Sequence, residues 1–143
     1  MISKKELIDM LSQYRLAHID ADILARKIED LRDRKTSATF MQEEGSRSTA
    51  PKDMSDYIVL LEALEEQLQA KLHDELKKLR TVQNLIWQMP QSTKRTLLAL
   101  RYLDGLSWLE VARRLGYSTR NVFRLHDAAL DECRRFMSPD FAL

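Results

Sequence analysis

The sequence predicts an all-α protein in which a long antiparallel helical hairpin precedes a small helix-turn-helix domain. Residues that interrupt helices are scarce, since the 143 residues include only three glycines and three prolines. Two long segments carry apolar residues at heptad spacing, and a third carries the apolar, small and glycine positions of a helix-turn-helix. The length suits one ordinary domain, or a small domain joined to an elongated helical one.

The first predicted helix runs from Ser3 to Arg34. Its apolar and small residues alternate at spacings of three and four, at Leu7, Met10, Tyr14, Ala17, Ala21, Leu24, Ile28 and Leu31. This alternation is a heptad seam, which a helix about 48 Å long cannot bury without a partner helix.

The second predicted helix begins near Asp53 and ends before Pro90, with a length of roughly 54 Å. Its seam comprises Met54, Ile58, Leu61, Leu68, Leu72, Leu79, Val82 and Ile86, widened by Tyr57, Leu64 and Leu76 and interrupted by Glu65 and Glu75. The matched lengths predict an antiparallel hairpin over residues 1–88. The width of the second seam leaves room for another copy, so we expect a homodimer joined through the long helices.

Residues 36–52 separate the two predicted helices. They are rich in Ser, Thr and Glu and contain Gly45 and Pro51. Long loops of this kind are rarely ordered within a compact domain, so a mobile connection is expected here.

Residues 89–137 form the predicted DNA-binding domain, and residues 138–143 are a C-terminal tail. Pro90 is expected at the first helical position, and the helix continues over residues 91–103. Gly105 is expected to end this helix at the position after its C-cap. Ser107 and Glu110 form a capping box that opens the next helix, which ends at Gly116.

A helix-turn-helix is predicted from about Ser107 to Arg135. Val111 and Leu115 are apolar, Ala112 is small where two helices approach, and Gly116 permits a sharp turn. Ser118 is a suitable N-cap for the second helix. The side chains expected to face inward are Tyr117, Val122, Leu125, Ala129, Cys133 and Phe136. The alternative is a plain helical hairpin with no role in DNA binding.

The second helix of such a motif lies in the major groove of DNA. The residues expected to contact bases are Thr119, Arg120, Asn121, Phe123 and Arg124, because arginine pairs with guanine, asparagine with adenine, and an apolar ring packs on the thymine methyl. The residues expected at phosphates are Lys94, Arg95, Arg113, Arg114 and Ser118. For each of them the alternative is a solvated surface side chain.

Composition permits nucleic-acid binding without requiring it. The net charge is +1, and the residues after Arg80 include 9 basic and 6 acidic side chains. The isolated glycines exclude a phosphate-binding loop, and His18, His73 and His126 lack metal-ligand spacing, so we expect neither an enzyme, nor a cofactor, nor a bound metal. Cys133 is the only cysteine and is expected in the core.

We also expect a cytoplasmic protein with no membrane partner. The longest unbroken apolar run, Tyr57 to Leu61, is too short to span a bilayer. The first residues are charged where a signal peptide would be apolar.

The stretch Met89-Pro90 through Leu103-Asp104-Gly105-Leu106-Ser107-Trp108-Leu109-Glu110-Val111-Ala112-Arg113-Arg114-Leu115-Gly116-Tyr117-Ser118 resembles region 4 of bacterial sigma factors. With the two long helices and polar loop before it, nearly the whole chain resembles phage-encoded transcriptional regulators of the RinA and ArpU type. The resemblance implies activation of phage genes in the bacterial cytoplasm, with base contacts at Thr119, Arg120, Phe123 and Arg124. The sequence departs from the sigma pattern at Phe123, Asp127 and Asp131. Carboxylates are unfavourable near phosphates, so DNA contact is expected to end after Arg124.

Two alternatives remain open from the sequence. Small terminase subunits of phage DNA-packaging machines also combine a helix-turn-helix with oligomerising helices, so the chain would then recognise DNA for packaging. In the other alternative the sigma-like unit docks on bacterial RNA polymerase without reading DNA.

Overall fold

The structure, a computed structural model, describes residues 2–43 and 54–137, with residues 35–43 described by their backbone alone. Its elements are α1 (Lys4–Glu43), α2 (Met54–Trp87), α3 (Thr93–Leu98), the π-helical turn η1 (Ala99–Leu103), α4 (Trp108–Leu115) and α5 (Thr119–Phe136). The described residues contain no strand, which confirms the predicted all-α class. None of the described helices is long and apolar enough to cross a membrane.

The chain divides into two compact units. Unit 1 consists of the described parts of Met1–Ala17 and Glu75–Leu143, and unit 2 of the described parts of His18–Asp74. Helices α1 and α2 each continue from one unit into the other.

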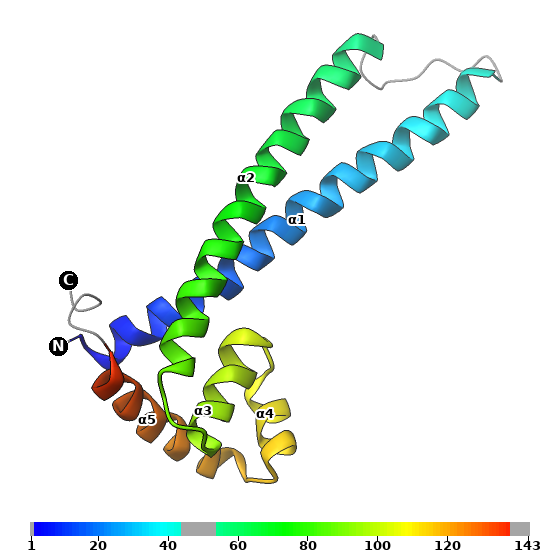
Figure 1. Cartoon of the computed structure of the whole chain (residues 1–143). Helices are drawn as coiled ribbons and strands as arrows, with labels where there is room; N and C mark the ends of the chain where they lie inside the picture. The colour runs from blue at the N-terminus through cyan, green and yellow to red at the C-terminus, as the bar shows by residue number, and fades with distance from the viewer. Residues whose placement is uncertain (1, 44–53, 138–143) are drawn as a thin grey trace. The chain divides into compact units, whose positions relative to one another are not determined.

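Unit 2 is a pair of antiparallel helical segments from α1 and α2 (Figure 1). Ala21 and Ile28 of the first seam and Tyr57 of the second are buried between them. The Tyr57 hydroxyl donates a hydrogen bond of 3.3 Å to the carbonyl of Leu31. The hairpin predicted from the heptads is therefore formed within one chain in this unit.

The second seam is less buried than the sequence predicts. Met54, Ile58 and Leu72 are 53%, 44% and 44% exposed, although all three belong to the predicted stripe. The stripe is wider than the face that a single partner helix covers, so its edge stays in contact with solvent. Among the described residues of unit 2, exposed apolar side chains therefore follow one side of α2.

Helix α1 runs past Arg34 to Glu43, so the prediction of a loop from about residue 36 is wrong for residues 36–43. No glycine or proline occurs before Gly45, and nothing in the intervening residues stops a helix. The remainder of the predicted loop, 44–52, lies outside the described residues, as does the tail 138–143.

Unit 1 has one hydrophobic core, built from both ends of the described chain. It contains Leu7 and Leu11 of α1, Val82, Leu85 and Ile86 at the end of α2, Met89 between α2 and α3, and Leu97, Leu98, Tyr102, Val111, Ala112, Val122, Ala129, Leu130 and Cys133 from the helices that follow. Cys133 is buried as predicted, and its thiol donates to the carbonyl of Leu85 at 3.8 Å. This core includes residues on both sides of the predicted domain boundary at residue 88.

The entry into α3 differs from the prediction that Pro90 is its first residue. The helix begins at Thr93, and Ser92 is its N-cap, with extended backbone and a side chain that accepts from the amide of Arg95 at 3.3 Å. A serine hydroxyl satisfies a free amide at the helix start, which proline has no group to do. The exit follows the prediction, since Gly105 has a φ of +70° and follows the last turn, η1. A side chain at Gly105 would also overlap the guanidinium of Arg15.

Candidate nucleic-acid interface

Helix α4 is defined by a serine at its start and a glycine at its end. Ser107 accepts a hydrogen bond of 3.2 Å from the amide of Glu110. The return bond of the predicted capping box is absent from the described residues, because the Glu110 carboxylate accepts from Arg113 at 3.0 Å instead. Gly116 ends the helix with a φ of +72° and nothing within 4 Å of its missing Cβ. The glycine is required here by backbone conformation and not by lack of space.

Helix α5 leaves this turn through a second serine cap. Ser118 has extended backbone, and its hydroxyl accepts from the amide of Asn121 at 3.2 Å. Val122 and Ala129 of α5 are fully buried, as is Val111 of α4. The sequence-predicted contact between the two helices is thus present. The capping bond uses Ser118 Oγ as an acceptor, so the hydroxyl hydrogen of this residue is still able to donate to a phosphate.

Two predictions of inward-facing side chains are wrong. Tyr117 is 44% exposed and Phe136 is 46% exposed. Tyr117 follows the left-handed residue of the turn, where the chain changes direction and its ring is directed away from the core. Phe136 is the last residue of α5, and Cys133 is the last buried residue on that helix, so the core ends before Phe136 is reached.

The five residues expected to contact bases form what we call the reading face: Thr119, Arg120, Asn121, Phe123 and Arg124. All five are exposed and lie on the first two turns of α5. Arg120 and Arg124 are one helical turn apart, on the side opposite the buried Val122. Within the described part of the chain neither guanidinium has a hydrogen-bond or ion-pair partner, so both donor sets remain available.

The basic residues of α3 are engaged in packing. Lys94 Nζ lies 4.0 Å from the Glu132 carboxylate. The Arg95 guanidinium lies 4.9 Å from the centroid of the Trp87 ring and donates to the carbonyl of Met89 at 3.4 Å. Their expected phosphate contacts would compete with these interactions.

The two arginines at the end of α4 differ from each other. Arg113 is exposed but ion-paired with Glu110 at 3.0 Å. Arg114 is exposed, and no described group forms a hydrogen bond or ion pair with it. Of the expected phosphate ligands, Arg114 therefore has the guanidinium most available to an external anion.

An aromatic cluster that the sequence did not reveal supports the reading face. The Trp108 ring lies 5.3 Å from Phe123 and 4.6 Å from His126, measured between centroids. The Arg101 guanidinium lies 4.4 Å from the Trp108 centroid and donates to the carbonyl of Leu106 at 2.9 Å. The Tyr102 hydroxyl lies 2.7 Å from His126 Nε2. Phe123 is therefore half exposed and rests on Trp108.

The position of Arg101 and Tyr102 in a π-helical turn explains why the sequence did not predict this cluster. Helical periodicity assumes 100° per residue, and a π-helical turn departs from it. Phe123 and His126 are three residues apart on α5, but no spacing in the sequence shows that side chains of η1 and α4 meet them.

Burial determines the protonation states of Tyr102 and His126. It lowers the pKa of His126 to about 4, with a further lowering by Arg101 and an opposing effect of Asp127. Burial also raises the pKa of Tyr102 to about 12, which Arg101 partly opposes. At neutral pH the phenol is protonated and the imidazole is neutral, and the tautomer of the ring sets which of the two groups donates in this hydrogen bond.

The two carboxylates on the outer side of α5 are compensated from the other end of the chain. Lys4 Nζ lies 2.8 Å from Asp127 and 3.2 Å from Asp131. The hydrogen bond to Asp127 is the main cause of a raised pKa at Lys4. Sequence reasoning treated these acids as uncompensated, because their partner lies 123 residues away from Asp127.

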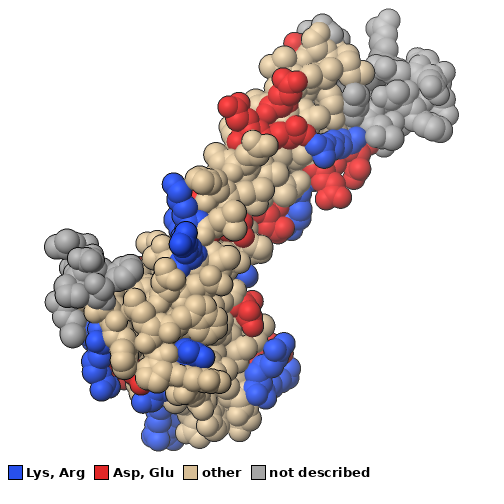
Figure 2. All heavy atoms as spheres, viewed as in Figure 1, with Lys and Arg blue, Asp and Glu red and all other residues tan. Residues whose placement is uncertain are grey.

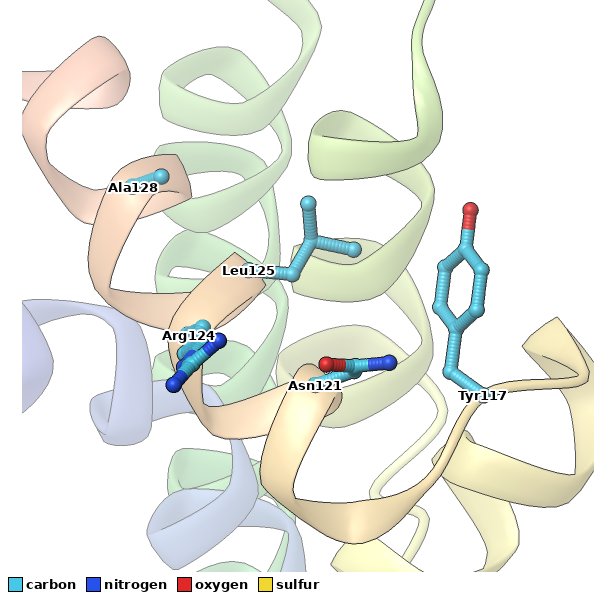
Figure 3. A pocket seen from close by; sticks show the side chains of 5 residues that line it. All are labelled: Tyr117, Asn121, Arg124, Leu125 and Ala128. Carbon is cyan, nitrogen blue, oxygen red and sulfur yellow. The ribbon is translucent and has the colours of Figure 1, made fainter.

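An open groove runs along one flank of α5. It has a volume of about 330 Å³ and is lined by Tyr117, Asn121, Arg124, Leu125 and Ala128 (Figure 3). We call it the α5 groove. Two of its lining residues, Asn121 and Arg124, belong to the reading face.

A protein-family model described as "Protein of unknown function (DUF1492)" matches residues 34–133. The chain belongs to the DUF1492 family. No curated protein and no solved structure matches it. The matched region of this DUF1492 protein includes α3, α4 and the reading face of α5 but not Lys4.

The surface of unit 1 carries basic side chains at several places in the view of Figure 2, with fewer acidic ones among them. Among the described residues, no group of three or more His, Cys, Asp or Glu side chains is arranged to hold a metal ion. On the first two turns of α5 this DUF1492 protein presents hydrogen-bond donors, positive charge and an apolar ring, and the carboxylates of the helix follow from Asp127 onward.

Proposed function

We propose that this chain is a sequence-specific regulator of transcription that binds double-stranded DNA through α4, the Gly116 turn and α5. The observation that carries the proposal is the pair Arg120 and Arg124. Both are exposed and without a partner among the described residues, on the first two turns of a helix that follows a glycine turn. Unpaired arginines at this position suit guanine N7 and O6 in the major groove.

The local structure favours DNA over a role in packing. The cations of α3 and Arg113 are paired or stacked within the protein, whereas Arg114, Arg120 and Arg124 are not. Free guanidiniums beside one turn provide phosphate contacts from α4 and base contacts from α5. That division of roles is the one a helix-turn-helix uses.

The resemblance to sigma region 4 and to RinA- and ArpU-type regulators extends the proposal. On that basis the chain activates phage genes in the cytoplasm of a bacterial host. The exposed Met54, Ile58 and Leu72 of unit 2 are the surface we assign to a homodimer joined through the long helices.

The test begins with selection of bound duplexes from a random pool, followed by Kd measurements with the full-length chain. Arg120→Ala and Arg124→Ala are expected to reduce the preference for the selected duplex by about 5- to 150-fold, the range for one bidentate arginine–guanine contact. Arg114→Ala should weaken binding to all duplexes similarly and reduce the salt dependence by about one phosphate contact. The matched control is Arg26→Ala, which removes an exposed arginine of unit 2 that pairs with Asp22.

Unchanged selectivity in both α5 variants would refute the assignment of the reading face. A chain with no affinity for duplex DNA even at low salt would refute DNA binding and favour docking on RNA polymerase. Light scattering distinguishes the packaging alternative, since a large closed ring would favour packaging and a dimer would favour regulation.

A further inference from the structure

The α5 groove lies on a flank of the helix that the reading face only borders. At 100° per residue, Asn121 and Ala128 are about 20° apart around the axis, and Phe123 is about 160° from Asn121. The groove and the Phe123 ring therefore lie on different sides of the Arg120 and Arg124 row.

The groove combines an apolar floor with a polar rim. Leu125 and Ala128 are half buried, and the Tyr117 ring stands at one end, 44% exposed. Asn121 supplies an amide at the rim and Arg124 a guanidinium, and no carboxylate lines the groove. Tyr117 does not contribute to the buried core between α4 and α5.

This arrangement matches the major-groove edge of an A·T pair. Adenine offers N7 and N6 to an asparagine amide, and the paired thymine carries an apolar methyl group close to them. Arg124 at the rim complements the negative charge of the DNA. An apolar peptide would offer the Arg124 guanidinium only neutral carbonyl oxygens, whereas DNA offers anionic phosphate oxygens, so nucleic acid fits the rim better.

We propose that the α5 groove receives the 5-methyl group of thymine in an A·T pair whose adenine is bound by Asn121. Tyr117 and Ala128 then become specificity-determining residues, beyond the five of the reading face. The proposal rests on the proposed function, because it assumes that α5 enters the major groove.

The test replaces thymine with deoxyuridine, one position at a time, in the fluorescein-labelled duplex obtained by selection. Deoxyuridine lacks only the methyl group. One position is expected to lose about fourfold in affinity, the effect of one buried methyl group. In Tyr117→Ser the same position should bind thymine and uracil equally, whereas Tyr117→Phe should behave as the wild type does.

Ala128→Leu is a second test variant at a partly exposed residue. Its larger side chain would occupy the part of the α5 groove that the thymine methyl group needs. It should bind the thymine duplex less tightly while leaving the uracil duplex less affected. Phe123→Ala separates the two apolar contacts, since it should remove a methyl effect at a different position. A thymine preference that is unchanged in both Tyr117→Ser and Ala128→Leu would overturn the inference while leaving DNA binding intact. Absence of any selected duplex would instead refute the proposed function.

Discussion

Protonation of His126 is expected to weaken the fold between neutral and acidic pH. The ring is enclosed by Tyr102 and Arg101 of η1 and by Trp108 of α4, with Asp127 as its neighbour on α5. Its pKa falls from 6.5 to about 4, so the folded state favours the neutral ring. Below pH 6.5 this histidine binds a proton in the unfolded chain, whereas in the folded chain it binds one only near pH 4.

The sign and size follow from this difference. A lowered histidine pKa contributes stability that is present above pH 6.5 and is lost progressively as the pH falls to about 4. At about 1.36 kcal/mol per pKa unit, the upper limit is about 3.4 kcal/mol. Because the ring is partly exposed, solvent screening reduces this value, and we expect a loss of roughly 1 kcal/mol at pH 5.

The assay is urea denaturation followed by circular dichroism at pH 7 and pH 5. The variant His126→Gln keeps a hydrogen-bonding group beside the Tyr102 hydroxyl but has no ionisable ring. From pH 7 to pH 5 its free energy of unfolding should therefore decrease by roughly 1 kcal/mol less than that of the wild type. The control is His73→Gln, at an exposed histidine of α2, which should preserve the pH dependence of the wild type. Equal losses in wild type and His126→Gln would refute the reasoning.

Three further predictions concern other parts of the chain. Gly116→Ala should lower the free energy of unfolding by about 1 kcal/mol, because its φ is +72° and its Cβ meets nothing; a neutral result in denaturation would contradict the backbone argument. Lys4→Ala should lower DNA affinity severalfold without changing sequence preference. In anisotropy measurements the double variant Lys4→Ala with Asp131→Asn should regain that affinity, and a failure to regain it would exclude charge compensation. If the proposed homodimer forms through unit 2, the double variant Met54→Glu with Ile58→Glu should be a monomer in light scattering where the wild type is a dimer, and a monomeric wild type would contradict the proposal.

The parts of the fold that the sequence predicted depend on local chemistry. Ser107 and Ser118 cap their helices as expected, and Gly105 and Gly116 adopt positive φ at the helix ends. Each of these features is decided by a few neighbouring residues, which is why reading the sequence was sufficient. The first heptad seam is similar, because the period of a helix is itself local.

The features that the sequence missed depend on contacts between distant residues or on departures from regular geometry. The aromatic cluster joins Arg101 and Tyr102 of a π-helical turn to side chains of α4 and α5, and periodicity contains no information about such a turn or about contacts between elements. Tyr117 shows the opposite error, since an apolar ring at a core offset proved to be exposed. Whether the Tyr117 side chain faces the core depends on the backbone conformation of the turn, and residue type alone does not determine that conformation.

The acidic residues of α5 show how a distant partner alters a functional argument. Asp127 and Asp131 alone give two negative charges on the outer side of the helix, which would repel a phosphate backbone. With Lys4 within 3.2 Å of both and the Arg134 guanidinium 3.5 Å from Asp131, the local sum is −2 + 2 = 0. Repulsion after Arg124 is therefore weaker than the helix sequence implies. The first turn of α1 belongs to the same compact unit as the reading face, and its charge is part of the electrostatic field that DNA would meet.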